Sequence, residues 1–340
     1  MVLTMELGKN SYDIVVERGA LERVGELLRL DRRVLVVTDH GVPQQYARAV
    51  ALASVQPTVV TVAVGEGSKS YETLAELHEA MLRGGFTRTD AVVAVGGGVV
   101  GDLAGFAAAT FMRGIDFYNI PTTVLSQVDS SIGGKTAINH AGVKNCIGAF
   151  HQPKRVIVDP DVLSTLPARQ VSNGLAEAIK MAATCDAELF ARMENEPIES
   201  ILDHVITSSL RIKKYVVEQD ETEKSLRRVL NFGHTLGHGI ESEAALLCEE
   251  RALYHGECVA LGMLPMCAPE VRERLTSVLK KAGLPTETEI DVDRALAAVA
   301  HDKKMSGDRI HYVYVPEIGC FEFRSATLSE YAQLVKGATH

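Results

Sequence analysis

The first half of the chain alternates short apolar runs with segments of helical periodicity. Three runs predict buried strands because they are rich in β-branched residues and keep no polar face: 34–38 (VLVVT), 58–64 (TVVTVAV) and 91–95 (AVVAV). Residues 117–120 and 156–158 predict weaker strands, and 3–17 suit a pair of short strands. Residues 43–53 and 71–83 carry the helical pattern between them. This alternation predicts an α/β unit with a mostly parallel sheet covered by helices on both faces.

The second half differs in its pattern. After about residue 160 the β-branched runs disappear, and amphipathic helical patterns dominate from 167 to about 300. A chain of 340 residues is long enough for roughly two domains. We therefore expect an α/β domain over 1–160 and an all-α domain over 161–340. The alternating segment 310–315 (IHYVYV) suits either a strand or an extended tail.

Charge and composition exclude several classes of partner. The 35 Lys and Arg stand against 44 Asp and Glu, and a net charge of −9 repels polyanions such as nucleic acid. The six cysteines form no C-x-x-C pair, no apolar run reaches about 18 residues, and the first residues lack a secretory pattern. We expect a cytoplasmic protein with no membrane or nucleic-acid partner, and base rates favour a homodimer.

A glycine-rich turn follows the third strong strand. Residues 96–102 (GGGVVGD) contain G-x-G-x-x-G between a strand and a helix of small residues, where backbone N–H groups can approach a pyrophosphate. The alternative is a tight turn that needs glycines of positive φ, and the pattern alone does not decide. An ordinary dinucleotide-binding domain carries this turn after its first strand. A second glycine loop, 65–69, offers Glu66 to ribose hydroxyls and Lys69 to phosphate.

Residues 113–154 predict a long site loop that binds an anion. The segment is rich in Gly, Ser and polar residues, and Lys135 directly follows two glycines, which suggests close approach of the backbone to a ligand. With Arg113 and Lys144 it would suit a carboxylate or a phosphate. Solvated surface lysines are the alternative. Asp129 and Asn145 lie in the same polar connections.

Three motifs in the second half offer metal ligands. Glu177 lies in GLAEAIK, His234 and His238 are spaced i, i+4 in NFGHTLGH, and His255 opens HGE. Two histidines and one carboxylate leave an open position for water or substrate, as in catalytic Zn²⁺ centres. The spacing does not decide whether His238 is the third ligand or a proton-transfer residue, and a core or capping role is common for any single histidine.

Other polar residues share the expected helix faces with these ligands. Lys180 lies one turn after Glu177. Arg227 and Asn231 precede His234 by seven and three residues, so on a continuous helix they share a face with His238. Such a polar face is costly to bury without a partner, which favours a substrate pocket.

The longest motifs together resemble one family. GGGVVGDLAGF, RGIDF, PTT, QVDSSIGGKT, KNCIGAFHQP, GLAEAIK, LNFGHTLGH and HGE occur in the order found in the 3-dehydroquinate synthase family. The resemblance implies an α/β NAD-binding domain followed by a helical metal-binding domain. It also implies conversion of an anionic sugar phosphate, 3-deoxy-D-arabino-heptulosonate 7-phosphate, into 3-dehydroquinate and phosphate. The implied cofactors are NAD and a divalent metal, Zn²⁺ or Co²⁺.

The resemblance also implies roles for individual residues. The metal ligands would be Glu177, His234 and His255, which leaves Glu223 and His238 as the proton-transfer pair. NAD would be bound by Glu66, Lys69, Gly97, Gly98, Val99, Asp102, Thr122, Thr123, Lys135 and Lys144. Substrate would be bound by Arg113, Asp129, Lys135, Asn145, Lys180, Lys213, Arg227, Asn231 and one of Lys303 or Lys304.

Three other functions compete with this interpretation. A metal-dependent polyol dehydrogenase would share the architecture, but a neutral polyol needs no such set of lysines and arginines. Another sugar phosphate cyclase would act on a substrate without a carboxylate, so Lys213, Arg227 and Asn231 together favour the heptulosonate. A non-catalytic scaffold would have no use for both a metal set and a proton-transfer set.

Overall fold

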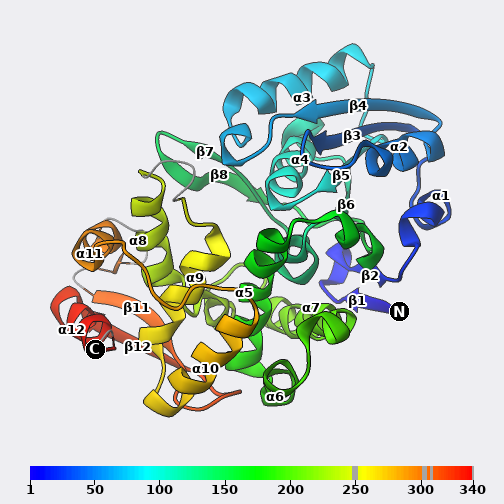
Figure 1. The fold of residues 1–340 in the computed structure, drawn as a ribbon. Helices are drawn as coiled ribbons and strands as arrows, with labels where there is room; N and C mark the ends of the chain where they lie inside the picture. Colours follow the sequence, from blue (N-terminus) through cyan, green and yellow to red (C-terminus); the bar gives the residue numbers. More distant parts are fainter. Residues whose placement is uncertain (247–251, 301–304, 307–308, 339–340) are drawn as a thin grey trace. The chain divides into compact units, whose positions relative to one another are not determined.

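The β-branched runs of the first half form a seven-stranded sheet in the computed structural model, which describes residues 1–246, 252–300, 305–306 and 309–338 (Figure 1). The strand order is β1-β2-β9-β6-β5-β3-β4, and every pairing is parallel except β1 with β2. The strands are β1 (Val2–Met5), β2 (Tyr12–Val16), β3 (Arg33–Asp39), β4 (Gln56–Val62), β5 (Ala91–Gly96), β6 (Asp116–Pro121) and β9 (Arg155–Val158). The predicted strands are therefore confirmed.

Side chains that alternate along the strands divide the core into two layers. Leu35 and Val37 of β3 pack with helices α3 (Tyr71–Arg83) and α4 (Gly98–Thr110). Val34 and Val36 point to the opposite face, where α1 (Val24–Leu27) and α2 (Gln44–Ala53) cover them. Helices thus cover both faces of the sheet, as the alternation predicted.

Two predictions for the first half were wrong in part. The run at 58–64 was expected to be buried, but β4 is an edge strand whose outward side chains are exposed. Residues 113–154 are not one long loop: β7 (Lys135–His140) and β8 (Val143–Phe150) form an antiparallel hairpin (Figure 1). Ile138 of this hairpin packs into the core layer that holds α4, which explains why α4 is apolar on several sides.

The chain divides into two units, Met1–Pro167 and Ala168–His340. The first extends slightly past the expected boundary at 160 because the 3-10 helix Pro160–Thr165 packs on it, with Tyr46 Oη 3.2 Å from the carbonyl oxygen of Val162. The helices of the second unit are α5 (Ala168–Cys185), α6 (Ala187–Asn195), α7 (Leu202–Gln219), α8 (His234–Ala244), α9 (His255–Met263), α10 (Pro269–Lys281), α11 (Val292–Ala300) and α12 (Leu328–Ala338).

The second unit is mainly helical. It is not the all-α domain that was expected from the sequence, because it also contains a small sheet. β10 (Met305–Ser306), β11 (Arg309–Tyr314) and β12 (Glu322–Thr327) form an antiparallel sheet. The segment 310–315 is therefore a strand for most of its length. The alternation matches burial at its end, where Val313 and Val315 are buried and Tyr314 between them is more exposed.

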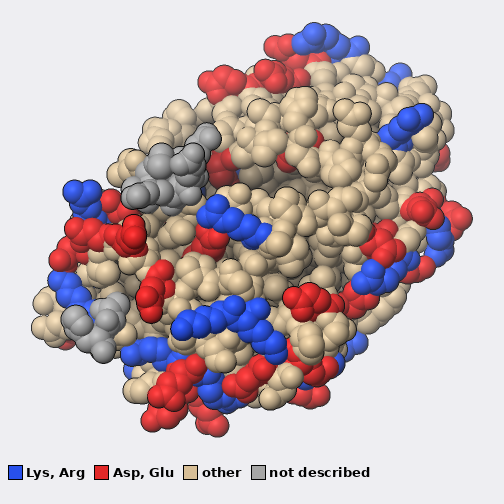
Figure 2. Space-filling model, viewed as in Figure 1, with Lys and Arg blue, Asp and Glu red and all other residues tan. Residues whose placement is uncertain are grey.

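The surface carries charges of both signs. On the face shown in Figure 2, Lys and Arg side chains lie among Asp and Glu side chains. No helix among the described residues has both the length and the apolar run needed to cross a membrane. The five cysteines within the described residues, 146, 185, 258, 267 and 320, are free thiols.

Candidate active site

The glycine-rich turn lies where the strand order reverses. From β3 the chain adds β4 on one side and then returns to form β5 on the other. Ligands of open α/β sheets bind beyond the carboxyl ends of the strands at such a point. This explains why the turn follows the third strong strand rather than the first, the feature that distinguishes it from an ordinary dinucleotide-binding domain.

Close packing, rather than positive φ, accounts for the glycines of this turn. None of Gly96, Gly97 and Gly98 has a positive φ. A Cβ on Gly97 would lie 3.1 Å from Cγ2 of Thr123, and one on Gly98 would lie 3.0 Å from Oγ of Ser130. No side chain caps the N-terminus of α4, where Gly97 is the N-cap. The turn therefore packs closely against Thr123 and Ser130, and it leaves the N-terminus of α4 free of a side-chain cap, where an anionic group could bind.

Lys69 is the centre of a polar cluster beside this turn. Its side chain is only 2% exposed, and its Nζ lies 2.7 Å from Oδ2 of Asp102 and also donates to Oδ1 of Asn145. Oε2 of Glu66 lies 3.8 Å from the same Nζ and accepts a hydrogen bond from Asn139. The structure thus brings together Glu66, Lys69 and Asp102, all expected at the NAD site. It adds Asn145, which was expected to contact substrate.

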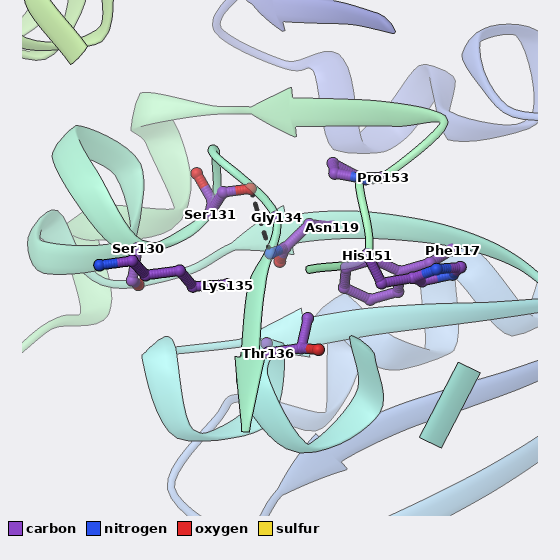
Figure 3. A pocket seen from close by; sticks show the side chains of 10 residues that line it. Phe117, Asn119, Ser130, Ser131, Gly134, Lys135, Thr136, His151 and Pro153 are labelled. Atoms are coloured by element: carbon purple, nitrogen blue, oxygen red, sulfur yellow. Dashed lines mark hydrogen bonds between the residues drawn. The ribbon is translucent and has the colours of Figure 1, made fainter. Parts of the chain in front are cut away.

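A small polar cavity lies behind the turn (Figure 3). Its volume is about 10 Å³, and it is lined by Ser130, Ser131, Asn119, Lys135 and Thr136 among others. Oγ of Ser130 and Oγ of Ser131 are buried and have no hydrogen-bond partner in the described part of the chain. The cavity has room for about one water molecule and none for a phosphate group. Any anionic ligand of Lys135 therefore lies outside this cavity.

The other expected ligands of the first unit occupy separate local structures. Thr122 is buried at the end of β6, where its N–H donates to the carbonyl oxygen of Gly96. Asp129 lies in the π-helical segment Ser126–Ser130. Arg113 is exposed with a φ of 68°, a conformation rarely adopted by a residue with a side chain. Lys144 is exposed in β8. Val99 lies half-buried in the first turn of α4.

In the second unit, glycines let α8 and α9 pack with their backbones in contact. Gly233 has a φ of 77° and ends the segment before α8, so that His234 becomes the first residue of that helix. A Cβ on Gly262 of α9 would lie 2.1 Å from the carbonyl oxygen of Gly233. This close approach packs the first turn of α8 against the last turn of α9. The rings of His234 and His255, the first residues of the two helices, lie with their centroids 5.3 Å apart.

Glu177, His234 and His255 converge on one point. Their candidate ligand atoms all lie within 4.8 Å of one another. Oε1 of Glu177 lies 3.5 Å from Nε2 of His234 and 3.5 Å from Nε2 of His255. Glu177 is fully buried, and this oxygen has no hydrogen-bond partner in the described part of the chain. A buried carboxylate oxygen facing two imidazole nitrogens is a donor set that fits a divalent ion.

Neighbouring groups fix the orientation of both imidazoles. Nδ1 of His234 lies 3.1 Å from the carbonyl oxygen of Phe232, and Nδ1 of His255 lies 3.4 Å from Oε2 of Glu241. Because both partners accept, each Nδ1 carries a proton, and loss of any proton from Nε2 leaves the lone pair of that nitrogen facing Glu177. This tautomer is the one that a metal ion at Nε2 requires.

The charges of this cluster are strongly coupled. Burial raises the pKa of Glu177, but the charges of Lys180 and His255 outweigh it and lower the pKa to about 2. Burial lowers the pKa of His255, but the carboxylates of Glu177 and Glu241 outweigh it and raise the pKa to about 10. Lys180, one turn from Glu177 on α5, donates to Oε2 of the same carboxylate. Oε1, the carboxylate oxygen that Lys180 does not bind, would be the ligand atom for an ion held here, and binding would release a proton from His255.

His238 lies beside the three candidate ligands but is not one of the convergent set. Its ring centroid is 5.4 Å from that of His234 and 6.0 Å from that of His255. It forms a second group of possible ligands with Glu241 and His255. The predicted i, i+4 pairing of His234 and His238 on one helix face is confirmed by α8.

The expected continuous helix face from Arg227 to His238 was wrong. Residues Leu226–Asn231 form a 3-10 helix, and the left-handed Gly233 separates it from α8. Arg227 is 2% exposed, and its guanidinium donates to the carbonyl oxygen of Glu221. Nδ2 of Asn231 donates to Oε1 of Glu223, 2.8 Å away. Local hydrogen bonds, rather than a shared helix face, bring these polar groups together.

Two carboxylates around the site, Asp220 and Glu241, were not predicted from the sequence. Asp220 ends α7 and accepts hydrogen bonds from the backbone N–H groups of Lys224, Ser225 and Arg227, and so shapes the segment that carries Glu223. Glu241 orients His255. Its position seven residues after His234, on the same face of one helix, is a signal that could have found it. Lys213 is buried on α7. Lys303 and Lys304 lie outside the described residues.

Comparison with known proteins places this geometry in a class and then in a family. The fold is that of sugar phosphate cyclases: 2-deoxy-scyllo-inosose synthase, in complex with carbaglucose-6-phosphate, NAD⁺ and Co²⁺, matches with a TM-score of 0.88 and 24% identity over 99% of this chain and 100% of its own. 2-epi-5-epi-valiolone synthase from Streptomyces hygroscopicus subsp. jinggangensis, with NAD⁺ and Zn²⁺ bound, matches with a TM-score of 0.86 and 28% identity over 96% and 95%.

Sequence comparison identifies the family. The models of the 3-dehydroquinate synthase N-terminal and C-terminal parts match residues 59–173 and 174–305. A 3-dehydroquinate synthase from Enterococcus faecalis is 42% identical over 340 residues, 94% of each chain. The chain belongs to the 3-dehydroquinate synthase family, as the motifs suggested.

Proposed function

We propose that the protein is a 3-dehydroquinate synthase, a lyase of the shikimate pathway. It would convert 3-deoxy-D-arabino-heptulosonate 7-phosphate into 3-dehydroquinate and phosphate. The observation that carries the proposal is the convergence of buried Glu177 with His234 and His255, in a chain that aligns with curated synthases over nearly its whole length. A structural core would not leave a buried carboxylate oxygen facing two imidazoles.

Both implied cofactors fit residues of the chain. Glu177, His234 and His255 would hold a Zn²⁺ or Co²⁺ ion. NAD would be held at the glycine-rich turn and the Lys69 cluster, where an uncapped helix N-terminus and buried polar groups suit a pyrophosphate and ribose. When bound, NAD accepts and later returns a hydride at C5 of the substrate, and the ion supplies Lewis-acid stabilisation of its hydroxyl groups.

The residues of the chain would position the substrate through its charged ends. Lys135 and Arg113 would bind the phosphate, with Asp129 nearby in the same segment. Lys213, Arg227 and Asn231 would bind the carboxylate, and Lys180 would contact a hydroxyl group beside the ligand set. Holding one molecule at both ends through elimination and ring closure keeps its reactive atoms in register.

Glu223 and His238 would move the protons. Elimination of phosphate removes the proton next to the C5 ketone, and ring closure then needs a proton at the new hydroxyl group. Two arrangements support these roles: His238 lies within 6.0 Å of the His255 ring, and the amide of Asn231 holds the carboxylate of Glu223.

Phosphate release from the heptulosonate tests the function. We expect release with substoichiometric NAD⁺, no accumulation of NADH, and loss of activity after treatment with a chelator. Accumulation of NADH with a neutral polyol would instead support the dehydrogenase, and turnover of sedoheptulose 7-phosphate or glucose 6-phosphate would support another cyclase. Retention of full activity by the chelated protein or by the variant His234→Ala would refute the ligand assignment.

The state of the protein in the cell is part of the proposal. We infer a homodimer in the cytoplasm, from the prevalence of symmetric dimers among soluble enzymes and from the free thiols, which suit a reducing compartment. Light scattering coupled to gel filtration measures the mass in solution, and a monomer would refute the dimer.

A further inference from the structure

The first three residues of α9, the HGE motif, face three residues of α5 that are spaced four apart. Arg169, Asn173 and Glu177 lie on nearly the same face of α5, because four residues make slightly more than one helical turn. Each meets one residue of the motif: Glu177 meets His255, Asn173 meets Gly256, and Arg169 meets Glu257. These three pairs are called the α5–α9 ladder below. Only its first pair contains candidate metal ligands.

Arg169 and Glu257 form a bidentate ion pair, and the Glu257 side of this pair is almost completely shielded from solvent. Nε of Arg169 lies 2.7 Å from Oε1 of Glu257, and its terminal nitrogen lies 2.8 Å from Oε2. The Glu257 side chain is 8% exposed, and the guanidinium carbon of Arg169 lies 4.1 Å from the ring centre of Tyr254. Such a pair fixes direction as well as distance, because two parallel hydrogen bonds hold both planar groups.

Glu257 also fixes where α9 begins. Its Oε2 accepts a hydrogen bond from the backbone N–H of Tyr254, 2.8 Å away, in a capping box that makes His255 the first residue of the helix. Arg169 donates a further hydrogen bond to the carbonyl oxygen of Ala252. The residues on both sides of His255 are therefore held by Arg169 and Glu257.

The middle pair sets the spacing between the helices. The N–H of Gly256 donates to Oδ1 of Asn173 over 2.6 Å, and a Cβ on Gly256 would lie 2.0 Å from the carbonyl oxygen of Asn173. Any other residue at position 256 would push α9 away from α5, and with it His255 away from Glu177.

We propose that Arg169, Asn173 and Glu257 are positioning residues that hold His255 in register with Glu177 for metal binding. The proposal rests on the metal site of the proposed function and assigns a role to Glu257, the last residue of the HGE motif. Metal ligands must be held within a few tenths of an ångström, so loss of the ladder weakens the ion's binding without removing a ligand.

A matched ion pair elsewhere in the second unit serves as the control. Arg274 binds Glu194 with the same bidentate geometry, at 2.9 and 2.8 Å, and its guanidinium lies 5.3 Å from the ring centre of Phe190. This pair joins α10 to residue 194 of α6, and neither residue belongs to the ligand set. Glu194→Gln therefore measures what losing an ion pair of this kind does to the unit as a whole.

The experiment measures Co²⁺ affinity of the full-length protein by competition with a chromogenic chelator, together with the visible absorption of bound Co²⁺. We expect Glu257→Gln and Arg169→Lys each to raise the Kd for Co²⁺ by about 10- to 100-fold and to change the absorption spectrum. Glu194→Gln should leave both within twofold of wild type. The double variant should match the single variants, because the two residues act as one unit.

Two results would overturn the ladder. One is a wild-type protein that binds Co²⁺ while Glu257→Gln and Arg169→Lys bind it within twofold of the wild-type Kd. The other is an equal loss of affinity in Glu194→Gln, which would show a general effect of stability. A wild-type protein that binds neither Co²⁺ nor Zn²⁺ would refute the metal site itself. Thermal melts by circular dichroism identify a variant that fails to fold, and Asn173→Ala then replaces it in the comparison with the same expected rise in Kd.

Discussion

The contact between α8 and α9 predicts that Gly262→Ala separates two metal ligands. A Cβ at this position would lie 2.1 Å from the carbonyl oxygen of Gly233, whereas ordinary contact begins at 3.4 Å. The helices must therefore move apart by about 1.3 Å at this point, the difference of those two distances. Gly233 directly precedes His234, and Gly262 lies on the helix that begins with His255, so the displacement acts on the distance between the two imidazoles.

The expected effects have different sizes for stability and for metal binding. Overpacking costs about 1–3 kcal/mol, and replacing a helical glycine by alanine returns about 1 kcal/mol, so we expect a net loss of about 0–2 kcal/mol in the free energy of unfolding. Metal–ligand distances tolerate deviations of about 0.2 Å, so the Kd for Zn²⁺ or Co²⁺ should rise by about 10-fold or more.

Urea unfolding followed by far-UV circular dichroism measures the first effect, since the chain contains no Trp for fluorescence, and chelator competition measures the second. The matched control is Gly337→Ala in α12, where a Cβ would meet nothing within 4 Å. We expect this control to gain between zero and about 1 kcal/mol and to bind metal normally. A Gly262→Ala protein with unchanged stability and unchanged Kd would refute the reasoning.

Three further predictions concern single side chains. Glu241→Ala should raise the Kd for the metal by about 10- to 100-fold by releasing the His255 ring, as measured by chelator competition; an unchanged Kd would remove its orienting role. Burial raises the pKa of Asp220, but three backbone N–H groups outweigh it and lower the pKa from 3.8 to about 2, so this carboxylate stabilises the fold fully above about pH 5 and loses that contribution as the pH falls toward 2. The difference in free energy of unfolding between wild type and Asp220→Asn should therefore shrink over that range in urea titrations, and a difference that grows toward low pH would contradict it. Lys135→Ala should lower kcat/KM for phosphate release by about 10²-fold, whereas Lys154→Ala, an exposed lysine of the same unit, should change it less than twofold; a change below threefold in Lys135→Ala would exclude the anion-binding role.

The elements that were predicted correctly are those whose residues are uniformly buried or whose ends carry local start and stop signals. The run 91–95 is buried on both faces of the sheet and reads as an unbroken apolar strand. The helix at 71–83 was predicted with its observed bounds, and the Arg83-Gly84 step ends it as expected; the structure adds that Ser70 caps its N-terminus. Local signals suffice in such cases.

The elements that were missed depend on contacts that no local pattern encodes. The β7–β8 hairpin looks like a polar loop because only a few of its side chains, such as Ile138, enter the core. The helix face from Arg227 to His238 failed because one glycine at positive φ turns the chain, and a period of 3.6 residues does not reveal where a helix restarts. Spacing could list the candidate ligands but did not decide between His238 and His255, and the convergence of Glu177, His234 and His255 needed the packing of α5, α8 and α9.

The position of the three proposed ligands along the chain would determine when an ion could be captured during synthesis. Glu177 leaves the ribosome first, and Lys180 on the next turn gives its carboxylate a partner within the same helix. His234 follows, and His255 comes last, at the start of a helix that ends at Met263. A nascent chain would have no complete metal site until α9 had emerged and packed against α5 and α8. Metal binding would therefore be a late event, and a bound ion would indicate that these helices are correctly assembled.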